Sequence, residues 1–386
     1  MLANTQPADT WTFPFTPQPP DWKLDWKGLA ESFSWVRDLA GTPQEPEYHG
    51  EGDVFIHTRM VAEAMIALPS WRSLPASERS LLFASALLHD VGKPAMTHLA
   101  ADGRISSRGH ARKGELLTRR ILCDGQELPP VALQAREYIA RLVRFHGLPL
   151  RFLDSPNPQR SVIEASQSVR LSHLTLLAEA DVRGRICADQ DELLTRIELF
   201  NAFCQEQECY DAPRQFATSH SRFTYFQKEQ SDPSYVAYDE TQFEVVLMSG
   251  LPGSGKDTWL KTNVPELPVV SLDELRRELH IAPTDDQGRV IQAARERARV
   301  MLRQKMAFAW NATNITHQLR QQLIDLFVSY GARVRLVYLD ASLPQLLERN
   351  RARRTYVPEA VLQRLLNKLE VPDLTEAQQV EWIENM

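Results

Sequence analysis

The sequence predicts a helical N-terminal domain followed by an α/β domain with a parallel sheet. Its length of 386 residues suits two domains. Helical periodicity runs from Trp26 to about Tyr210, and strands alternate with helices from Phe243 onward, which is typical of a parallel sheet. We therefore expect a helical domain at 23–210, a connector at 211–242 and an α/β domain at 243–386.

The composition excludes several classes of protein. Hydrophobic residues make up 43% and charged residues 24%, as in globular proteins, and the net charge of -6 argues against a strongly basic protein that coats nucleic acid. No apolar run approaches the roughly 18 residues of a membrane span, and the N-terminus lacks the pattern of a secretory signal. Four cysteines without CxxC spacing favour a reduced, cytoplasmic location.

The helical half shows apolar stripes at helical spacing. Leu29, Phe33 and Val36 form one stripe, and the nearly continuous apolar run 81–88 predicts a buried helix. No strand is expected in this half. The connector 211–242 is polar but rich in aromatic residues, so we expect it to be packed.

Histidines and aspartates follow one another along the helical half. A charged aspartate beside a histidine at the end of a buried helix is costly unless a cation compensates. A single histidine on an apolar face is usually a hydrogen-bonded core residue, but an ordered series of six such positions predicts a site for divalent metal. The six predicted ligands are His57, His89, Asp90, His110, His146 and Asp181.

The α/β half opens with an apolar strand at 243–248, with further strands expected at 268–271 and 333–339. A glycine-rich loop follows the first strand and precedes a helix, which is the context of a phosphate-binding P-loop. The predicted ATP-binding residues are Gly250, Gly253, Ser254, Gly255, Lys256, Asp257 and Thr258. Lys256 is expected to reach the β- and γ-phosphates.

One residue departs from the usual P-loop pattern. Asp257 replaces the Ser or Thr that normally follows the lysine, and Thr258 comes one place later. We assign Mg²⁺ to Thr258. Asp257 either contacts the metal indirectly or caps the helix, and capping is favoured.

Three further groups of residues follow expected strands. Asp273 and Arg276 come after the second strand, where a carboxylate suits a general base and an arginine a phosphate clamp, although Asp273 could instead cap the next helix. Segment 310–314 ends a helix or a short strand and could hold substrate. Arg349 and Arg353, one helical turn apart in a basic run, suit a lid over the γ-phosphate, the alternative being a solvated helix end.

Residues 243–370 resemble the P-loop 5′-hydroxyl polynucleotide kinases. The resemblance rests on the P-loop, the Asp273-x-x-Arg276 pair, segment 312–314 and the Arg349–Arg353 spacing. It implies that ATP or another NTP binds with Mg²⁺, that Asp273 activates a 5′-hydroxyl, and that Arg276 binds a neighbouring phosphate.

Residues 50–205 resemble the HD-domain metal phosphohydrolases. They contain the H…HD…D order as His57, His89, Asp90 and Asp181, with His89 to Lys93 reading HDxGK. The resemblance implies one or two divalent ions (Mn, Co, Ni, Fe, Zn or Mg²⁺), with His110 and His146 at the second. It also implies that Lys93 or Arg185 neutralises charge.

The pairing of the two halves resembles bacterial enzymes of RNA end healing. It implies removal of a 2′,3′-cyclic phosphate, 2′- or 3′-phosphate and phosphorylation of a 5′-hydroxyl on broken RNA or DNA ends, with a ligase as functional partner. Two alternatives remain open: an HD nucleotide phosphohydrolase fused to a small-molecule kinase, and a regulatory protein in which one site only senses a ligand.

Overall fold

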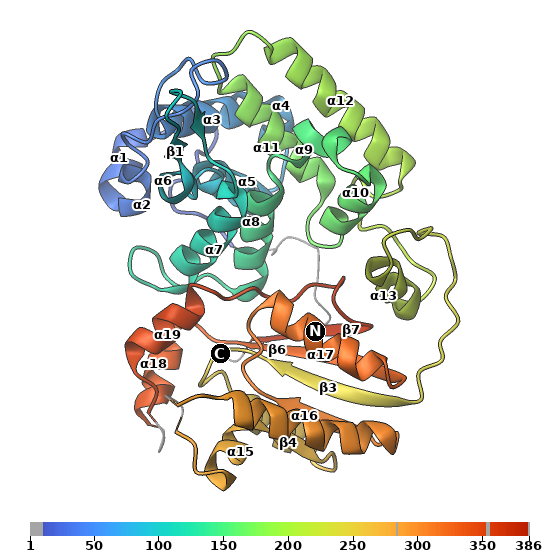
Figure 1. Ribbon diagram of the computed structural model, residues 1–386. Coiled ribbons are helices and arrows are strands. Elements are labelled where there is room, and N and C mark those ends of the chain that lie inside the picture. The colour runs from blue at the N-terminus through green and yellow to red at the C-terminus, as the bar shows by residue number, and fades with distance from the viewer. Residues whose placement is uncertain (1–10, 283–284, 353–355, 385–386) are drawn as a thin grey trace. The chain divides into compact units, whose positions relative to one another are not determined.

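The computed structural model describes residues 11–282, 285–352 and 356–384. The chain divides into two compact units, one ending at Gln215 and the other beginning at Phe216. The first unit is built of helices and the second surrounds a five-stranded sheet whose strand pairs are all parallel (Figure 1). The predicted fold class, helical followed by parallel α/β, is confirmed.

The helical unit contains α-helices and one 3₁₀ helix, η1. In chain order they are α1 (Trp26–Ser32), α2 (Ser34–Arg37), α3 (Val54–Ala67), α4 (Pro69–Arg72), α5 (Ala76–Leu88), α6 (Lys93–Met96), α7 (His110–Cys123), α8 (Leu133–Phe145), α9 (Leu148–Arg151), η1 (Phe152–Asp154), α10 (Pro158–Ser166), α11 (Leu171–Arg183) and α12 (Gln190–Glu206).

Helices α3, α5, α8 and α11 pack against one another in the core of this unit. As predicted, α5 is enclosed, because its residues from Ser80 to Leu88 are all buried. The helix ends at Leu88, directly before His89 and Asp90. His89 and Asp90 therefore lie in the interior of the protein, where water cannot easily solvate a carboxylate.

The first predicted stripe is divided between two helices. Leu29 lies on α1 and Val36 on α2, while Phe33 between them is extended, so the expectation of one continuous helix is wrong. The ring of Phe33 contacts Phe13 and Phe15, with centroids 5.7 and 5.5 Å apart. These aromatic contacts with the segment that precedes α1 favour a local break over an unbroken helix.

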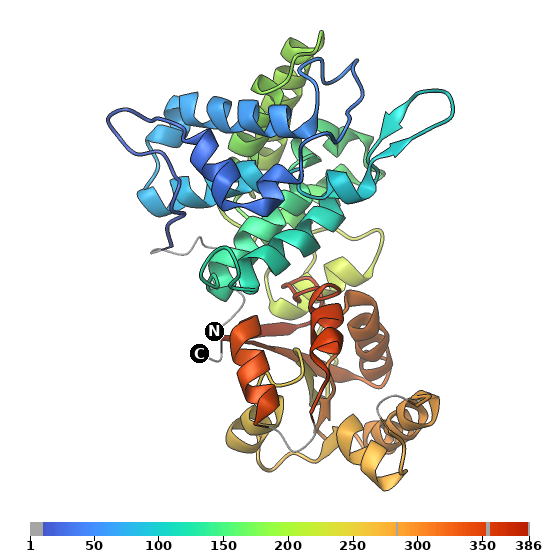
Figure 2. The ribbon, with the colours of Figure 1, turned by 90° about the vertical axis from the view of Figure 1, so that its left-hand side faces the viewer.

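A small antiparallel hairpin interrupts the helices, although no strand was expected here. Strands β1 (His98–Leu99) and β2 (Ile105–Ser106) pair across a turn that contains Asp102 and Gly103 (Figure 2). Gly103 has a φ of 86°, which glycine adopts without strain. The Asp-Gly pair is a hairpin signal, but strands of two residues are too short to show a periodic pattern.

The second unit alternates strands and helices. Its strands are β3 (Phe243–Ser249), β4 (Val269–Ser271), β5 (Phe308–Asn311), β6 (Ala332–Asp340) and β7 (Gln379–Glu384), arranged in the order β4-β5-β3-β6-β7. Its helices are α13 (Ser219–Gln227), α14 (Lys256–Asn263), α15 (Leu272–Glu278), α16 (Gly288–Arg303), α17 (His317–Val328), α18 (Leu343–Arg351) and α19 (Glu359–Leu366). Two of these strands were not assigned from the sequence. Strand β5 shows that segment 310–314 ends a strand and not a helix, and β7 had no sequence signal.

The parallel sheet brings several loops to one edge. Because parallel strands all point the same way, the segments that follow β3, β4 and β5 leave the sheet at its carboxyl edge. The register agrees, since Leu247 pairs with Trp310, and Val270 and Ser271 pair with Trp310 and Asn311. The glycine-rich loop, the start of α15 and segment 311–314 therefore gather at this edge.

The segment interpreted as a connector contains helix α13, which packs into the second unit. Thr218 caps the helix by accepting a hydrogen bond from the Ser221 N–H. Phe223 belongs to the apolar core formed by the sheet and its helices, and Arg333 of β6 donates to Ser219 Oγ at 2.8 Å.

None of the helices in the described part of the chain has both the length and the apolar character to cross a membrane.

Candidate metal centre and phosphate-binding loop

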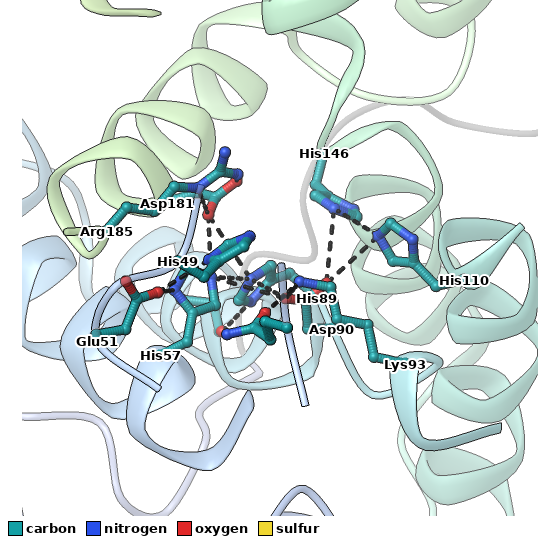
Figure 3. A network of polar contacts seen from close by, with 12 residues as sticks. His49, Glu51, His57, His89, Asp90, Lys93, His110, His146, Asp181 and Arg185 are labelled. Carbon is teal, nitrogen blue, oxygen red and sulfur yellow. Dashed lines mark hydrogen bonds and ion pairs between the residues drawn. The ribbon is translucent and has the colours of Figure 1, made fainter. Parts of the chain in front are cut away.

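Three core helices bring four of the predicted metal ligands together (Figure 3). His57 lies on α3, His89 and Asp90 follow α5, and Asp181 lies on α11. His57 Nε2 is 3.1 Å from Asp181 Oδ1 and 3.3 Å from His89 Nε2, and His89 Nε2 is 3.2 Å from Asp90 Oδ2. All four side chains are buried, with at most 2% exposure. They form one half of the cluster.

The other half surrounds the second oxygen of Asp90. His110, the first residue of α7, places Nε2 at 3.4 Å from Asp90 Oδ1, and His146, which follows α8, places Nε2 at 4.0 Å. The two imidazoles are themselves 3.3 Å apart at Nε2. The structure thus brings all six predicted ligands into one cluster, with Asp90 between its two halves.

Contacts at Nδ1 orient the four imidazoles. His89, His110 and His146 each place Nδ1 2.8 Å from a backbone carbonyl, those of Ala86, Ser107 and Val143. A carbonyl can only accept, so each Nδ1 must hold a proton, and in the neutral imidazole the Nε2 lone pair then faces the centre. His57 Nδ1 likewise lies 2.8 Å from Glu51 Oε1.

This arrangement fits bound cations better than hydrogen bonds. Burial lowers the pKa values of His110 and His146, so their Nε2 atoms, 3.3 Å apart, are bare and have no proton to share. In addition, the buried Asp90 Oδ1 has no hydrogen-bond partner in the described residues, although it faces His110 and His146. Imidazole and carboxylate are the donors that Mn, Fe, Co, Ni and Zn accept. Subsets of the cluster can offer ligand atoms within 4.8 Å of one another, on each side of Asp90.

The electrostatics of the cluster favour ionised carboxylates and neutral outer imidazoles. Burial opposes ionisation of Asp90, but Lys93 and His89 outweigh it and hold the pKa of that carboxyl well below its ordinary value. Burial lowers the pKa of His146 to about 3, with help from His110 and His89. Both carboxylate and imidazole therefore offer lone pairs near neutral pH.

Two cations lie beside the carboxylates. Lys93 Nζ is 2.7 Å from Asp90 Oδ2 and donates to Gln44 Oε1 at 2.6 Å, and the lysine is only 8% exposed. Arg185 pairs with Asp181 through Nε, at 3.0 Å, and through Nη2. Burial works against ionisation of Asp181, yet Arg185 and His57 hold the pKa of Asp181 well below its ordinary value.

Sequence reasoning missed two residues behind His57. Glu51 is 2.9 Å from His49 Nδ1 and 2.8 Å from His57 Nδ1 through Oε1, and its Oε2 accepts from the Ile186 N–H at 2.8 Å. A carboxylate on the far nitrogen of a ligand histidine orients the ring and raises its basicity. The only available signal was the His-x-Glu spacing just before α3, which lies outside the motif. His98, in contrast, lies on the surface.

The glycine of the HDxGK run explains how α7 reaches the cluster. A Cβ on Gly92 would lie 2.1 Å from the His110 carbonyl oxygen and 2.7 Å from the Gly114 nitrogen. Only a residue without a side chain allows α7 to approach the turn after α5 this closely. The approach places His110 against Asp90.

The cluster opens into a cavity of about 960 Å³. Asp90, His110, His146 and Asp181 line it, together with Lys93 and residues from the β2–α7 loop, α9, α10 and α12. A cavity of this size can admit a substrate larger than a phosphate ion.

The glycine-rich loop joins β3 to α14 as predicted. Gly253 and Gly255 have φ values of 88° and 100°. A Cβ on Gly250 would lie 2.5 Å from the Leu339 carbonyl oxygen of β6, so the first loop glycine allows close packing. Lys256 Nζ donates to the carbonyls of Gly250 and Leu251 at 2.8 and 2.9 Å, which holds the ammonium against the loop.

Asp257 does not cap α14. Gly255 is the N-cap, and Asp257 lies inside the first turn, where its carboxylate accepts a hydrogen bond from Asn311 Nδ2 at 2.5 Å. The favoured capping interpretation is therefore wrong, because the helix begins two residues earlier than a cap at Asp257 requires. Thr258 is exposed on the same turn. Asn311 ends β5, so this contact joins two neighbouring segments of the sheet edge.

Asp273 is not a helix cap either, because Ser271 caps α15 through its side chain. Asp273 pairs instead with Arg276, whose Nε also donates to Gln287 Oε1 at 2.6 Å. Asp273 is largely exposed, with 68% of its side chain accessible. The predicted pair is thus in contact at the carboxyl edge of the sheet.

Segment 312–314 supports the phosphate loop through its backbone. The Gly250 N–H donates to the Thr313 carbonyl at 2.9 Å, and Asn314 Nδ2 donates to the Met248 carbonyl at 2.7 Å. Arg320, six residues after Asn314, is fully buried and forms two hydrogen bonds of 2.7 Å with Glu376. Arg320 therefore has a structural position, away from solvent.

The predicted lid is only partly described. Arg349 lies near the end of α18, and Arg353 lies outside the described residues. Helix α18 approaches the loop, since a Cβ on Gly253 would lie 3.7 Å from the Leu346 carbonyl oxygen.

Comparisons with known proteins agree with this division. Residues 54–193 match the family described as HD domain, and residues 245–372 match the family described as AAA domain. The chain thus joins an HD domain to a P-loop domain. The multifunctional CCA protein of Thioalkalivibrio sulfidiphilus (strain HL-EbGR7) is 31% identical over 166 residues, which cover 42% of this chain and 37% of that protein. A multifunctional CCA protein of Acidovorax sp. (strain JS42) is 30% identical over 167 residues, 42% of this chain and 36% of its own length.

Similar solved structures overlap with about a third of the chain. A structure of the Pnkp1/Rnl/Hen1 RNA repair complex has a TM-score of 0.31 and 17% identity, covering 36% of this chain and 47% of that one. A gluconokinase from Sinorhizobium meliloti 1021 has a TM-score of 0.29 and 22% identity, covering 36% and 82%.

Proposed function

We propose that this chain is a bifunctional enzyme that heals nucleic-acid ends. Its HD domain removes 2′,3′-cyclic phosphate, 2′-phosphate or 3′-phosphate, and its P-loop domain transfers the γ-phosphate of ATP to a 5′-hydroxyl. The observation that supports this most directly is the cluster around Asp90, where imidazole lone pairs approach both oxygens of one carboxylate. Such a centre suits phosphoester hydrolysis, and a P-loop on the same chain suits phosphoryl transfer.

In the HD domain, His57, His89, Asp90 and Asp181 would hold one divalent ion, and Asp90, His110 and His146 a second. Bound ions would supply Lewis acidity to the phosphate and to the attacking water. Removal of a cyclic phosphate takes two hydrolyses: one water opens the ring to a monoester, and a second releases inorganic phosphate and leaves both hydroxyls.

Lys93 is the cation best placed to meet the phosphate. Its ammonium is 2.7 Å from Asp90 Oδ2 and it lines the cavity, so it can neutralise charge that builds on the phosphoryl oxygens. Arg185 also lines the cavity, but its two contacts with Asp181 favour a role in holding that carboxylate in place.

In the P-loop domain, Lys256 and the loop amides would bind the β- and γ-phosphates. The 5′-hydroxyl oxygen forms a bond to the γ-phosphorus as the bond to the β-phosphate oxygen breaks, ADP leaves, and Asp273 takes the hydroxyl proton. Arg276 would hold the acceptor's nearest phosphate. Mg²⁺ would be bound near Thr258 and Asp257, with Arg349 and Arg353 near the γ-phosphate.

One experiment tests both activities. The protein is incubated with ATP, a divalent metal and an end-labelled RNA that bears a 5′-hydroxyl and a 2′,3′-cyclic phosphate, and both ends are mapped. The proposal expects a 5′-phosphate and a 3′-terminal diol. Parallel reactions contain nucleosides and nucleotides in place of the oligonucleotide. Phosphorylation of nucleosides without any change at the RNA ends would overturn the proposal in favour of a small-molecule kinase.

A further inference from the structure

The cavity above the metal centre is lined by many basic side chains. Lys93, Arg108, Arg112, Arg144, Arg151, Arg185 and Arg196 all contribute to its wall. A single terminal phosphate meeting two metal ions and Lys93 does not need this many cations. The surplus points to a second anionic group on the substrate.

Several of these cations already have protein partners. Arg185 pairs with Asp181, Arg196 donates to Glu192 at 2.8 Å, and Arg144 lies 3.7 Å from Glu115. Arg108 and Arg151 differ from them. Within residues 11–282, 285–352 and 356–384, neither of these two guanidinium groups has a hydrogen-bond or ion-pair partner. Both side chains are exposed to the solvent of the cavity.

Both arginines flank the same half of the metal centre. Arg108 lies in the loop after β2, two residues before His110. Arg151 ends α9, five residues after His146, and its Nη2 lies 4.0 Å from the point where a Cβ on Gly147 would be. Because His110 and His146 are 3.3 Å apart at Nε2, the two loops converge on the Asp90 Oδ1 side of the cluster.

We propose that Arg108 and Arg151 form a binding subsite for the phosphodiester next to the terminal phosphate. This inference rests on the proposed hydrolysis of terminal phosphates and adds that the HD site prefers ends with at least two nucleotides. Arginine suits the task, because its planar guanidinium donates two parallel hydrogen bonds to phosphate oxygens.

The test compares two substrates that differ by one nucleotide, which brings with it the additional phosphodiester. A nucleoside 3′-phosphate and a dinucleotide 3′-phosphate are hydrolysed by the whole protein, and by Arg108→Ala, Arg151→Ala and the double variant. We expect the native protein to prefer the dinucleotide by about 10-fold or more in kcat/KM, as one or two charge-assisted contacts allow. The double variant should lose this preference, through a higher KM for the dinucleotide, while its rate on the nucleoside 3′-phosphate stays within about two-fold.

Arg120→Ala is the matched control. Arg120 is exposed on α7, the helix that begins at His110, but it does not line the cavity, so its removal should leave the preference intact. A second readout is salt: the native preference should fall as NaCl rises, and the double variant should be less sensitive.

The outcomes separate the two proposals. Equal rates of the native protein on both substrates would overturn the subsite and leave terminal phosphate hydrolysis standing. A preference that survives in the double variant would overturn the assignment to these arginines. Hydrolysis of neither substrate, under metal conditions in which p-nitrophenyl phosphate is cleaved, would overturn the proposed function and the subsite with it.

Discussion

Replacement of Glu51 by Gln should weaken metal binding without unfolding the protein. Glu51 is not a predicted ligand, yet its Oε1 lies 2.8 Å from the Nδ1 of His57 and 2.9 Å from that of His49. Burial opposes ionisation of Glu51, but hydrogen bonds from these two histidines and from the Ile186 N–H outweigh it and lower the pKa of this carboxyl. The carboxylate is thus ionised and increases the basicity of the ring that faces the metal centre.

The size of the effect follows from these contacts. A glutamine oxygen can still accept from both imidazoles, but the amide nitrogen would then face the Ile186 N–H, donor against donor. The variant therefore loses the charge and one hydrogen bond. Loss of such an outer partner typically reduces metal affinity 10- to 100-fold, or about 1.4 to 2.7 kcal/mol.

The assay is a competition titration of Mn²⁺ or Zn²⁺ against a chromophoric chelator, with circular dichroism to check folding. Glu63→Gln is the matched control, because Glu63 lies on α3, the same helix as His57, but is exposed and pairs with Arg59 on the helix surface. Only the Glu51 variant should bind its tighter ion more weakly. Equal affinity of the two variants and the native protein would refute the reasoning that Glu51 acts through His57.

Three further changes test other parts of the structure. Lys256→Ala should reduce kinase activity at least 100-fold and spare phosphohydrolysis, and Asp90→Ala should do the reverse; phosphate chemistry that survives in both would show that neither site is catalytic. Gly92→Ala should cost about 2 kcal/mol or more, since the new Cβ overlaps the backbone of α7, and should abolish phosphohydrolysis while kinase activity remains. Glu376→Gln should destabilise the second unit by about 3 to 5 kcal/mol in urea unfolding, because Arg320 would remain buried without its charge partner. In the native protein, burial opposes ionisation of Glu376, but Arg320 outweighs it and lowers the pKa to about 2. Its contribution is therefore present above about pH 4.5 and is lost as the pH falls toward 2, a dependence that the variant should lack.

Local patterns predicted much of the fold and of both candidate sites. The P-loop could be located because its strand, glycines and lysine are contiguous, and backbone conformation there depends on neighbouring residues. The buried helix α5 could be predicted because its apolar run is long and continuous. The break at Phe33 was not predicted, because it depends on a contact with Phe13, 20 residues earlier in the chain. The β1–β2 hairpin was not predicted, because strands of two residues leave no periodic signal.

Contacts between distant residues were beyond this kind of reasoning. Arg320 closely follows segment 310–314, but it is buried against Glu376, which lies 56 residues later in the chain. The contact between Glu51 and His57 was missed for a similar reason, because Glu51 belongs to none of the motifs found in the sequence. Asp257, favoured as a cap, meets Asn311 at the end of a neighbouring strand.

The sequence alone determined the fold class and named the six residues that gather in the candidate metal centre, because residue type and order are enough to indicate which chemistry a segment can support. Tertiary structure alone decided that both oxygens of Asp90 face imidazoles, that Glu51 lies behind His57, and that Arg108 and Arg151 line one cavity. The physical reason is distance. His57 and His89 are 32 positions apart in the chain but 3.3 Å apart in space, and helix packing sets that separation.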